Sequence, residues 1–201
     1  MIVGFVYPKG GWRRAASYVV HRLRRLPDPP HRIARGVAAG VFVCFTPFFG
    51  FHFVMAAGLA YVMQGNIVAS LLATFFGNPL TFPIIAAVCL ELGQWMLNTP
   101  NVGPLPEVFA GFGRASAELW HNFTAIFTPE TAHWDRLGDF FWRVMWPYTV
   151  GGLVPGVITS VLAYMLARAA VAAYQRRRIG QLKRRYEARV NKSRAAPPAS
   201  E

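Results

Sequence analysis

Two long stretches of the chain carry no charged residue, and they determine the expected fold. No Asp, Glu, Lys or Arg occurs in residues 36–90, and none occurs in residues 144–167. About 18 uncharged, largely apolar residues are enough to cross a bilayer as a helix. A soluble protein would need polar faces on its helices, and the first stretch has no charge to supply them. The pattern predicts an all-α, polytopic membrane protein.

Three breaks divide the first apolar block, residues 31–98. They lie at Thr46-Pro47, Gly65-Asn66 and Asn78-Pro79, and they leave apolar pieces of roughly 11–18 residues, a length typical of re-entrant or broken helices. Paired broken segments line the binding sites of some transporters. Polar residues and prolines at this depth form a candidate polar pathway, which consists of Thr46, Pro47, His52, Asn66, Asn78, Pro79, Thr81 and Glu91.

A simpler interpretation exists for part of this set. Asparagine is a favoured helix cap, and Asn-Pro is a common turn signal. Asn66 and Asn78 would then only cap helix ends, and Glu91 would lie at the membrane interface. Both interpretations stay open at the level of sequence.

Residues 1–30 form a basic amphipathic segment. Trp12, Val19 and Leu23 fall on one face of a helix predicted over residues 12–26, and prolines end it from Pro27 onward. A basic helix of this kind lies in the plane of the membrane interface. Its candidate lipid-headgroup residues are Arg13, Arg14, Arg22, Arg24 and Arg25.

Residues 99–142 form an amphipathic, aromatic-rich connector. A stripe of apolar residues at helical spacing runs from Leu105 to Ile126, and Thr128-Pro129-Glu130 is a helix start signal. The only Lys or Arg residues in or directly after the connector are Arg114, Arg136 and Arg143. Because cytoplasmic loops are rich in Lys and Arg, we expect interfacial helices on the outer membrane face.

Residues 143–175 form a C-terminal transmembrane helix. Its small residues Gly151, Gly152 and Gly156 are candidate helix-packing positions, because small side chains let helices approach closely. Residues 176–201 form a basic cytoplasmic tail, in which Arg176, Arg177 and Arg178 stop the span and bind lipid headgroups. We expect no regular structure after Asn191.

The distribution of charge sets the orientation. The net charge is +12, yet residues 1–35 and 168–201 hold eighteen of the 21 Lys and Arg residues. Basic segments beside apolar spans indicate cytoplasmic ends and lipid partners rather than nucleic acid. Two cytoplasmic ends require an even number of crossings, so the first block crosses three times, or once with a re-entrant hairpin.

Several motifs resemble those of the DUF2062 family of bacterial membrane proteins, in its alphaproteobacterial form. They are Gly11-Trp12-Arg13-Arg14-Ala15, residues 33–40, Thr46-Pro47-Phe48-Phe49-Gly50-Phe51-His52, Gly77-Asn78-Pro79-Leu80-Thr81 and Glu91-Leu92-Gly93. The resemblance covers most of residues 8–185 and implies a bacterial inner-membrane protein of unassigned function. It supplies no catalytic residue.

The inventory of reactive groups argues against an enzyme. Within the apolar block only His52 and Glu91 could serve as acid or base, and Cys44 and Cys89 are most simply apolar packing residues. No histidine has metal-ligand spacing, so we expect no metal and no cofactor. The first functional hypothesis is non-catalytic binding or translocation of a small amphipathic or lipid-linked solute at the paired breaks. The alternative is a structural or assembly subunit, which packs on a membrane protein partner or on another copy of itself.

Overall fold

The computed structural model describes residues 12–101, 103–125, 127, 131 and 134–195, and every regular element in these ranges is helical. The elements in chain order are α2 (Trp12–Arg25), α3 (Pro30–Val43), α4 (His52–Val62), α5 (Ile67–Ala73), η1 (Thr74–Phe76), α6 (Phe82–Leu97), α7 (Leu105–Ala125), α8 (Asp135–Phe140), η2 (Phe141–Met145) and α9 (Trp146–Ala195). The all-α prediction is confirmed for this part of the chain. The helix start signal at residues 128–130 lies outside it.

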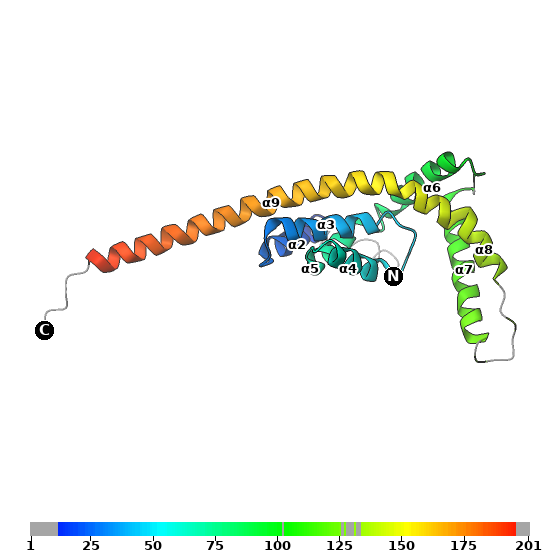
Figure 1. The fold of residues 1–201 in the computed structure, drawn as a ribbon, viewed down its shortest axis with the longest axis horizontal. Helices are drawn as coiled ribbons and strands as arrows, with labels where there is room; N and C mark the ends of the chain where they lie inside the picture. The colour runs from blue at the N-terminus through cyan, green and yellow to red at the C-terminus, as the bar shows by residue number, and fades with distance from the viewer. Residues whose placement is uncertain (1–11, 102, 126, 128–130, 132–133, 196–201) are drawn as a thin grey trace.

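Helix α9 is the longest element, and α3 lies alongside it (Figure 1). The two helices run in opposite directions, because Phe42 near the end of α3 lies against Gly156, while Asp28 before α3 bonds Gln175 far along α9. Figure 1 also shows α4 and α5 on the other side of α3 from α9. The first apolar block is therefore folded back on itself beside one long helix.

Hydrogen bonds fix the direction of each short helix. The Arg35 guanidinium donates to Met63 O at 3.0 Å, so the end of α4 lies beside the beginning of α3. Asn66 N donates to Arg32 O at 2.9 Å, so α5 starts at the same place. Helix α3 thus leads away from Asp28, α4 returns, and α5 leads away again. Helices α3 and α4 form a hairpin whose tip contains Thr46 and Pro47.

Glycines allow the backbones of these helices to touch. A Cβ atom on Gly36 would overlap Asn66 O, and one on Gly40 would overlap Ser70 O, so α5 packs on a small-xxx-small face of α3. A Cβ on Gly93 would likewise overlap Pro147 O, which places α6 directly on the start of α9. The spacing of Gly36 and Gly40 was a signal in the sequence that we did not use.

The connector forms a hairpin of its own. Helices α7 and α8 lie side by side and turn away from α9 at its Trp146 end (Figure 1). Glu118 of α7 accepts hydrogen bonds from the backbone N–H groups of Arg136 (3.3 Å) and Leu137 (2.5 Å) at the start of α8. The π-helix η2 then joins α8 to α9 without a break.

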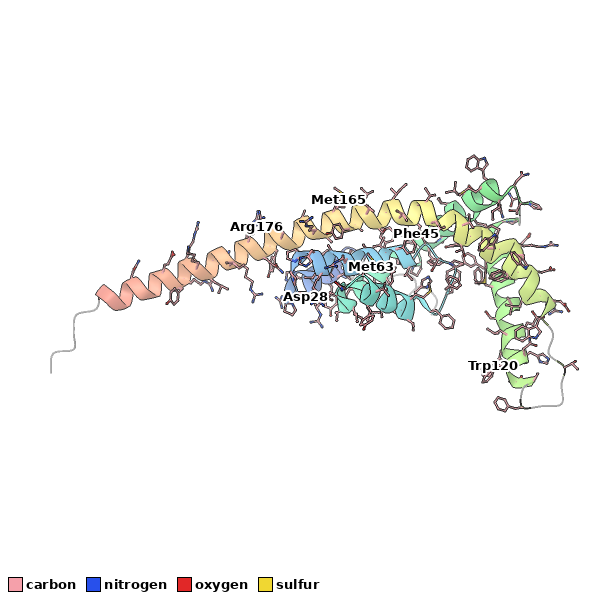
Figure 2. All side chains as sticks on the ribbon, viewed as in Figure 1. Asp28, Phe45, Met63, Trp120, Met165 and Arg176 are labelled. Atoms are coloured by element: carbon pink, nitrogen blue, oxygen red, sulfur yellow. The ribbon has the colours of Figure 1, made fainter. Side chains whose placement is uncertain are left out.

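Many large apolar side chains lie on the outside of the bundle, and several alanines are buried inside it. Ala34, Ala56 and Ala69 are fully buried, whereas Tyr61 is 77% exposed and Leu166 is 72% exposed. Figure 2 shows side chains projecting from α9 along its length. One helical run, Asp135–Ala188, is long and apolar enough to cross a membrane by length and composition.

The tail differs from what we expected. Helix α9 continues through Arg176–Arg178 and past Asn191 to Ala195, whereas we expected no regular structure after Asn191. The segment contains good helix formers, and Lys183 and Glu187 are 3.9 Å apart at i,i+4 spacing, which favours a helix. The basic residues of the tail therefore do not end the helix.

Candidate functional site

The first break is closed by its own side chains. Thr46 Oγ1 donates to Val43 O at 2.8 Å, and His52 Nε2 lies 3.2 Å from Thr46 O. Thr46 and Pro47 are buried, and His52 is half-buried at the start of α4. The polar atoms of Thr46 and His52 therefore stabilise the turn between α3 and α4.

The Asn78-Pro79 break is a closed turn as well. Asn78 Oδ1 accepts hydrogen bonds from Leu80 N (2.9 Å) and Thr81 N (3.1 Å). Thr81 Oγ1 donates to Phe76 O at 2.5 Å and lies 3.0 Å from Asn78 N, from which it accepts. Asparagine commonly bonds its own backbone in this way at turns. Pro79 lies within the turn and is exposed.

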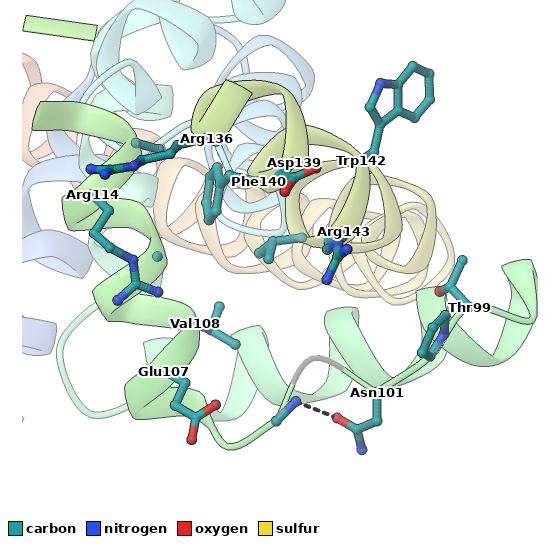
Figure 3. Close-up of a pocket in the computed structure, with 15 residues that line it drawn as sticks. Thr99, Asn101, Glu107, Val108, Arg114, Arg136, Asp139, Phe140, Trp142 and Arg143 are labelled. Carbon is teal, nitrogen blue, oxygen red and sulfur yellow. Dashed lines mark hydrogen bonds between the residues drawn. The ribbon is translucent and has the colours of Figure 1, made fainter. Parts of the chain in front are cut away.

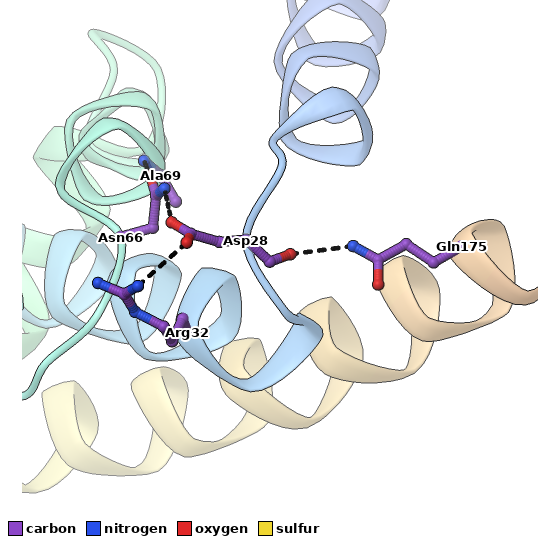
Figure 4. A network of polar contacts seen from close by, with 5 residues as sticks. All are labelled: Asp28, Arg32, Asn66, Ala69 and Gln175. Carbon is purple, nitrogen blue, oxygen red and sulfur yellow. Dashed lines mark hydrogen bonds and ion pairs between the residues drawn. The ribbon is translucent and has the colours of Figure 1, made fainter.

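Asn66 belongs to a different place, the Asp28 end of the bundle. Its side chain accepts from Ala69 N at 2.7 Å and so caps α5, and its amide donates to Asp28 Oδ2. The same Asp28 carboxylate pairs with Arg32 at 3.1 Å, and Asp28 O accepts from Gln175 Nε2 at 3.0 Å (Figure 4). Asn66 thus performs the capping role of the simpler interpretation, with a link to α9 through Asp28.

The two proline breaks meet through one aromatic side chain. The ring of Phe49, from the first break, lies 4.7 Å from that of Phe82 at the start of α6, and His52 lies 6.3 Å from Phe82. Phe112 of α7 lies 4.6 Å from Phe49 on the connector side. We call Phe49, His52, Phe82, Phe112 and Tyr148 the aromatic cluster. Of the predicted pathway residues, the cluster contains His52.

Tyr148 is the residue of this cluster that sequence reasoning missed. It is 1% exposed, its ring lies 6.4 Å from that of Phe49, and its hydroxyl has no hydrogen-bond partner in the described part of the chain. A buried hydroxyl without a partner costs free energy, so such groups call for a specific reason. The signal available in the sequence was a hydroxyl-bearing aromatic inside the uncharged residues 144–167.

Glu91 lies apart from the breaks. It is exposed on α6 and borders an open pocket of about 440 Å³ that Gln94, Asn101 and Gly103 also line. The eight pathway residues therefore occupy four places: the Thr46-Pro47 break, the Asn78-Pro79 break, the Asp28 end and this pocket. Only the two proline breaks come together.

The three glycines predicted as packing positions of α9 lie at contacts within the chain. A Cβ on Gly151 would overlap Cys89 O and Gly93 N of α6, and one on Gly152 would overlap Phe45 O. Gly156 has more room, since its nearest neighbour would be the Phe45 Cβ at 3.1 Å. These glycines hold α9 against α6 and against the end of α3.

The candidate headgroup residues lie at one end. Arg14, Arg22 and Arg25 are exposed on α2, and the exposed Arg176–Arg178 follow Gln175 on α9. The side chains of Arg13 and Arg24 lie outside the described part of the structure. Since Gln175 bonds Asp28, both basic segments lie at the Asp28 end of the bundle, as the labelled Asp28 and Arg176 show in Figure 2.

A protein-family model described as "Uncharacterized protein conserved in bacteria (DUF2062)" matches residues 13–180. The chain belongs to the DUF2062 family. The match includes both proline breaks, the aromatic cluster and the glycine contacts of α9, so the DUF2062 sequence pattern covers nearly the whole bundle. No curated protein and no solved structure matches the chain.

Proposed function

We propose that this DUF2062 protein is a polytopic protein of the bacterial inner membrane with both ends in the cytoplasm. Three observations support this: the apolar run within Asp135–Ala188, the exposed large apolar side chains of the bundle, and the shared position of both basic ends. Basic segments on one side of an apolar body follow the positive-inside rule.

In this arrangement α3 and α4 form a re-entrant hairpin. They contain 14 and 11 residues, which at 1.5 Å per residue is about 21 Å and about 16 Å, less than the hydrocarbon thickness of about 30 Å. Helices α5 and α6 together form one broken crossing, and α9 forms the second. The hairpin tip with Thr46 and Pro47 is buried in protein, as lipid requires.

Cysteine accessibility in intact cells tests this topology. Single cysteines replace Ser17, Ser116 or Ser193 in a chain that carries Cys44→Ala and Cys89→Ala. An impermeant thiol reagent should label position 116 alone, since the connector faces outward. Labelling at position 17 or 193 would contradict cytoplasmic ends, and no labelling at position 116 would contradict an outer connector.

The function that we propose is non-catalytic binding or translocation of a small amphipathic or lipid-linked solute at the paired breaks. One observation carries the proposal: the breaks meet at Phe49 beside Tyr148, whose buried hydroxyl has no partner in the described part of the chain. A solute with one polar group would bond this hydroxyl and lay its apolar part against the rings of Phe49 and Phe82. Ligand sites commonly combine an apolar lining with a few polar groups in this way.

Tyr148→Phe tests the proposal, with Tyr164→Phe on the same helix as the matched control. The probe is a fluorescent lysophosphatidylcholine added to the purified protein in nanodiscs. Loss of one hydrogen bond should weaken binding about fivefold in Tyr148→Phe and leave Tyr164→Phe unchanged. Equal affinity in both variants would contradict a role for the hydroxyl. Asn78→Ala is a poor test, because Asn78 Oδ1 closes its own turn.

The assembly alternative gains no support from the glycines that suggested it. Gly151 and Gly152 are occupied by α6 and by the end of α3, so a partner cannot pack on them in this arrangement. Substitution there would disturb the chain itself before it released another protein.

A further inference from the structure

The connector contains an open pocket. It has a volume of about 800 Å³ and lies between α7, the α8–η2 segment and the turn after α6 (Figure 3). It is not formed by the paired breaks. The lining residues of interest are Thr99, Glu107, Arg114, Arg136, Asp139 and Arg143.

The cations of this pocket are exceptional for their position in the chain. Arg114, Arg136 and Arg143 are the only Lys or Arg residues between residues 36 and 167, and all three line the same pocket. In the part of the chain that the structure describes, none of them has a salt bridge, and their side chains make no hydrogen bond with protein groups. The fold thus places three arginines around one pocket, and their N–H groups donate no hydrogen bond to the described part of the chain.

Two buried donors lie beside them. Thr99 Oγ1 lines the pocket, is buried, and has no partner among the described residues. Gln94 is 7% exposed, and its Nε2 also has no partner there; it lines the adjoining pocket of Glu91, which shares Asn101 and Gly103 with this one. Buried polar groups are nearly always hydrogen-bonded, so the Thr99 hydroxyl in the lining of this pocket points to a missing partner.

The acids of the region do not cancel this pattern. Glu107 and Asp139 line the pocket, so the guanidinium groups exceed the carboxylates by one. Glu118 and Asp135 border the neighbouring hollow with Arg114 and Arg136, but Glu118 is committed to the backbone at the start of α8. The lining side chains without a partner among the described residues thus include three guanidinium groups and the Thr99 hydroxyl as well as the two carboxylates.

The floor of the pocket is apolar and connects with the aromatic cluster. Val108, Phe140 and Val144 are buried beneath it. The Phe140 ring lies 4.5 Å from Phe112, which in turn lies 4.6 Å from Phe49. Three of its wall residues, Trp142, Arg143 and Val144, belong to the π-helix η2, a rare element that is often found at functional sites.

We propose that this pocket binds the phosphate group of an anionic ligand, either a lipid headgroup or a free phosphate. Guanidinium groups match phosphate oxygens in a bidentate geometry. Three of them, with the Thr99 hydroxyl, supply more donors than the two oxygens of a carboxylate accept, whereas a phosphate has three or four oxygens. The site is separate from the paired breaks, so it stands even if the aromatic cluster binds nothing.

Binding of two probes to the purified full chain in a zwitterionic detergent tests this site. The probes are radiolabelled inorganic phosphate and dihexanoyl phosphatidic acid, each measured at low and high salt. Arg114→Gln and Arg143→Gln should each weaken binding about tenfold, as expected for loss of a charge-assisted hydrogen bond. Arg184→Gln, which removes the same charge from an exposed position of α9, should leave affinity unchanged.

The outcomes separate the sources of the phosphate. Binding of both probes, with loss in the pocket variants, assigns the site to phosphate itself. Binding of phosphatidic acid alone, with the same loss, assigns it to a lipid headgroup. Equal affinity in all variants, or no binding of either probe to the unaltered protein, overturns the site. If a glutamine variant does not fold, Arg143→Lys replaces it, and an intermediate loss is then the supporting result.

Discussion

The two ends of α9 differ in how their polar side chains are used. At the Asp28 end, Asp28, Arg32, Asn66 and Gln175 bond one another across three segments of the chain. At the Trp146 end, Tyr148, Thr99 and Gln94 carry buried groups without partners among the described residues. Burial of a polar group is costly unless it is bonded, so the first end is built for stability. At the second end, buried polar groups are not bonded to the described part of the chain, which costs folding free energy.

The largest effect should come from Gly151→Ala, which separates α6 from α9 at the Trp146 end. Its Cβ would overlap backbone atoms of Cys89 and Gly93, and backbone cannot move aside as a flexible side chain can. We expect a loss of about 3 kcal/mol in the free energy of unfolding. The measurement is thermal unfolding of the purified protein in detergent.

Gly180→Ala is the matched control on the same helix. No atom lies within 4 Å of a Cβ at Gly180, and alanine favours helix over glycine. Its melting temperature should stay level or rise. A Gly151→Ala protein as stable as this control would show that α6 and α9 are not held together by this contact.

Asn66→Ala tests the Asp28 end. The substitution removes the cap of α5 and leaves Asp28 with one bond fewer, and we expect a loss of about 2 kcal/mol. Asn66→Ser, which keeps a capping oxygen but does not donate the same amide to Asp28, should lose less. If both variants match the unaltered protein in melting temperature, the network at this end does not stabilise the fold.

Tyr148→Phe should have the smallest effect on the free energy of unfolding. Asn66→Ala should lower this free energy, whereas Tyr148→Phe should not. Because the hydroxyl lacks a partner in the described chain, its removal without solute present should leave the melting temperature unchanged or raise stability by about 1 kcal/mol. A clear loss of stability would mean that the hydroxyl is bonded, and the contrast between the two ends would fail at this residue.

Much of the fold could be predicted from local pattern. The proline breaks, the helix over residues 12–25 and the long apolar helix in α9 follow from apolar runs and turn residues. The pairing of the breaks through Phe49 could not, because it depends on contacts between residues more than thirty positions apart. The same limit explains why Asn66 was grouped with Asn78. Both precede apolar helices, but Asn66 bonds Asp28, 38 positions away, whereas Asn78 bonds within its own turn.

The pocket arginines illustrate a different limit. The low number of Lys and Arg residues predicts that the connector lies on the outer face of the membrane. That prediction uses only the number of arginines and not the positions of Arg114, Arg136 and Arg143. The three arginines line one pocket only when Glu118 fixes the start of α8 against α7. Unpaired donors are likewise invisible in a sequence, since any Thr or Gln has partners available until the chain folds.

The continuous helix beyond Arg178 has an electrostatic consequence. If Arg176 lies at headgroup level and α9 leaves the membrane along its normal, Lys183 lies about 10 Å farther out at 1.5 Å per residue. The Debye length at physiological ionic strength is about 8 Å. Arg176, Arg177 and Arg178 would then experience the full surface potential of the bilayer, whereas Lys183 would experience about a quarter of it and the cations after it still less. One continuous helix would thus grade the positive charge of the tail from residues that respond strongly to lipid composition to residues that respond weakly.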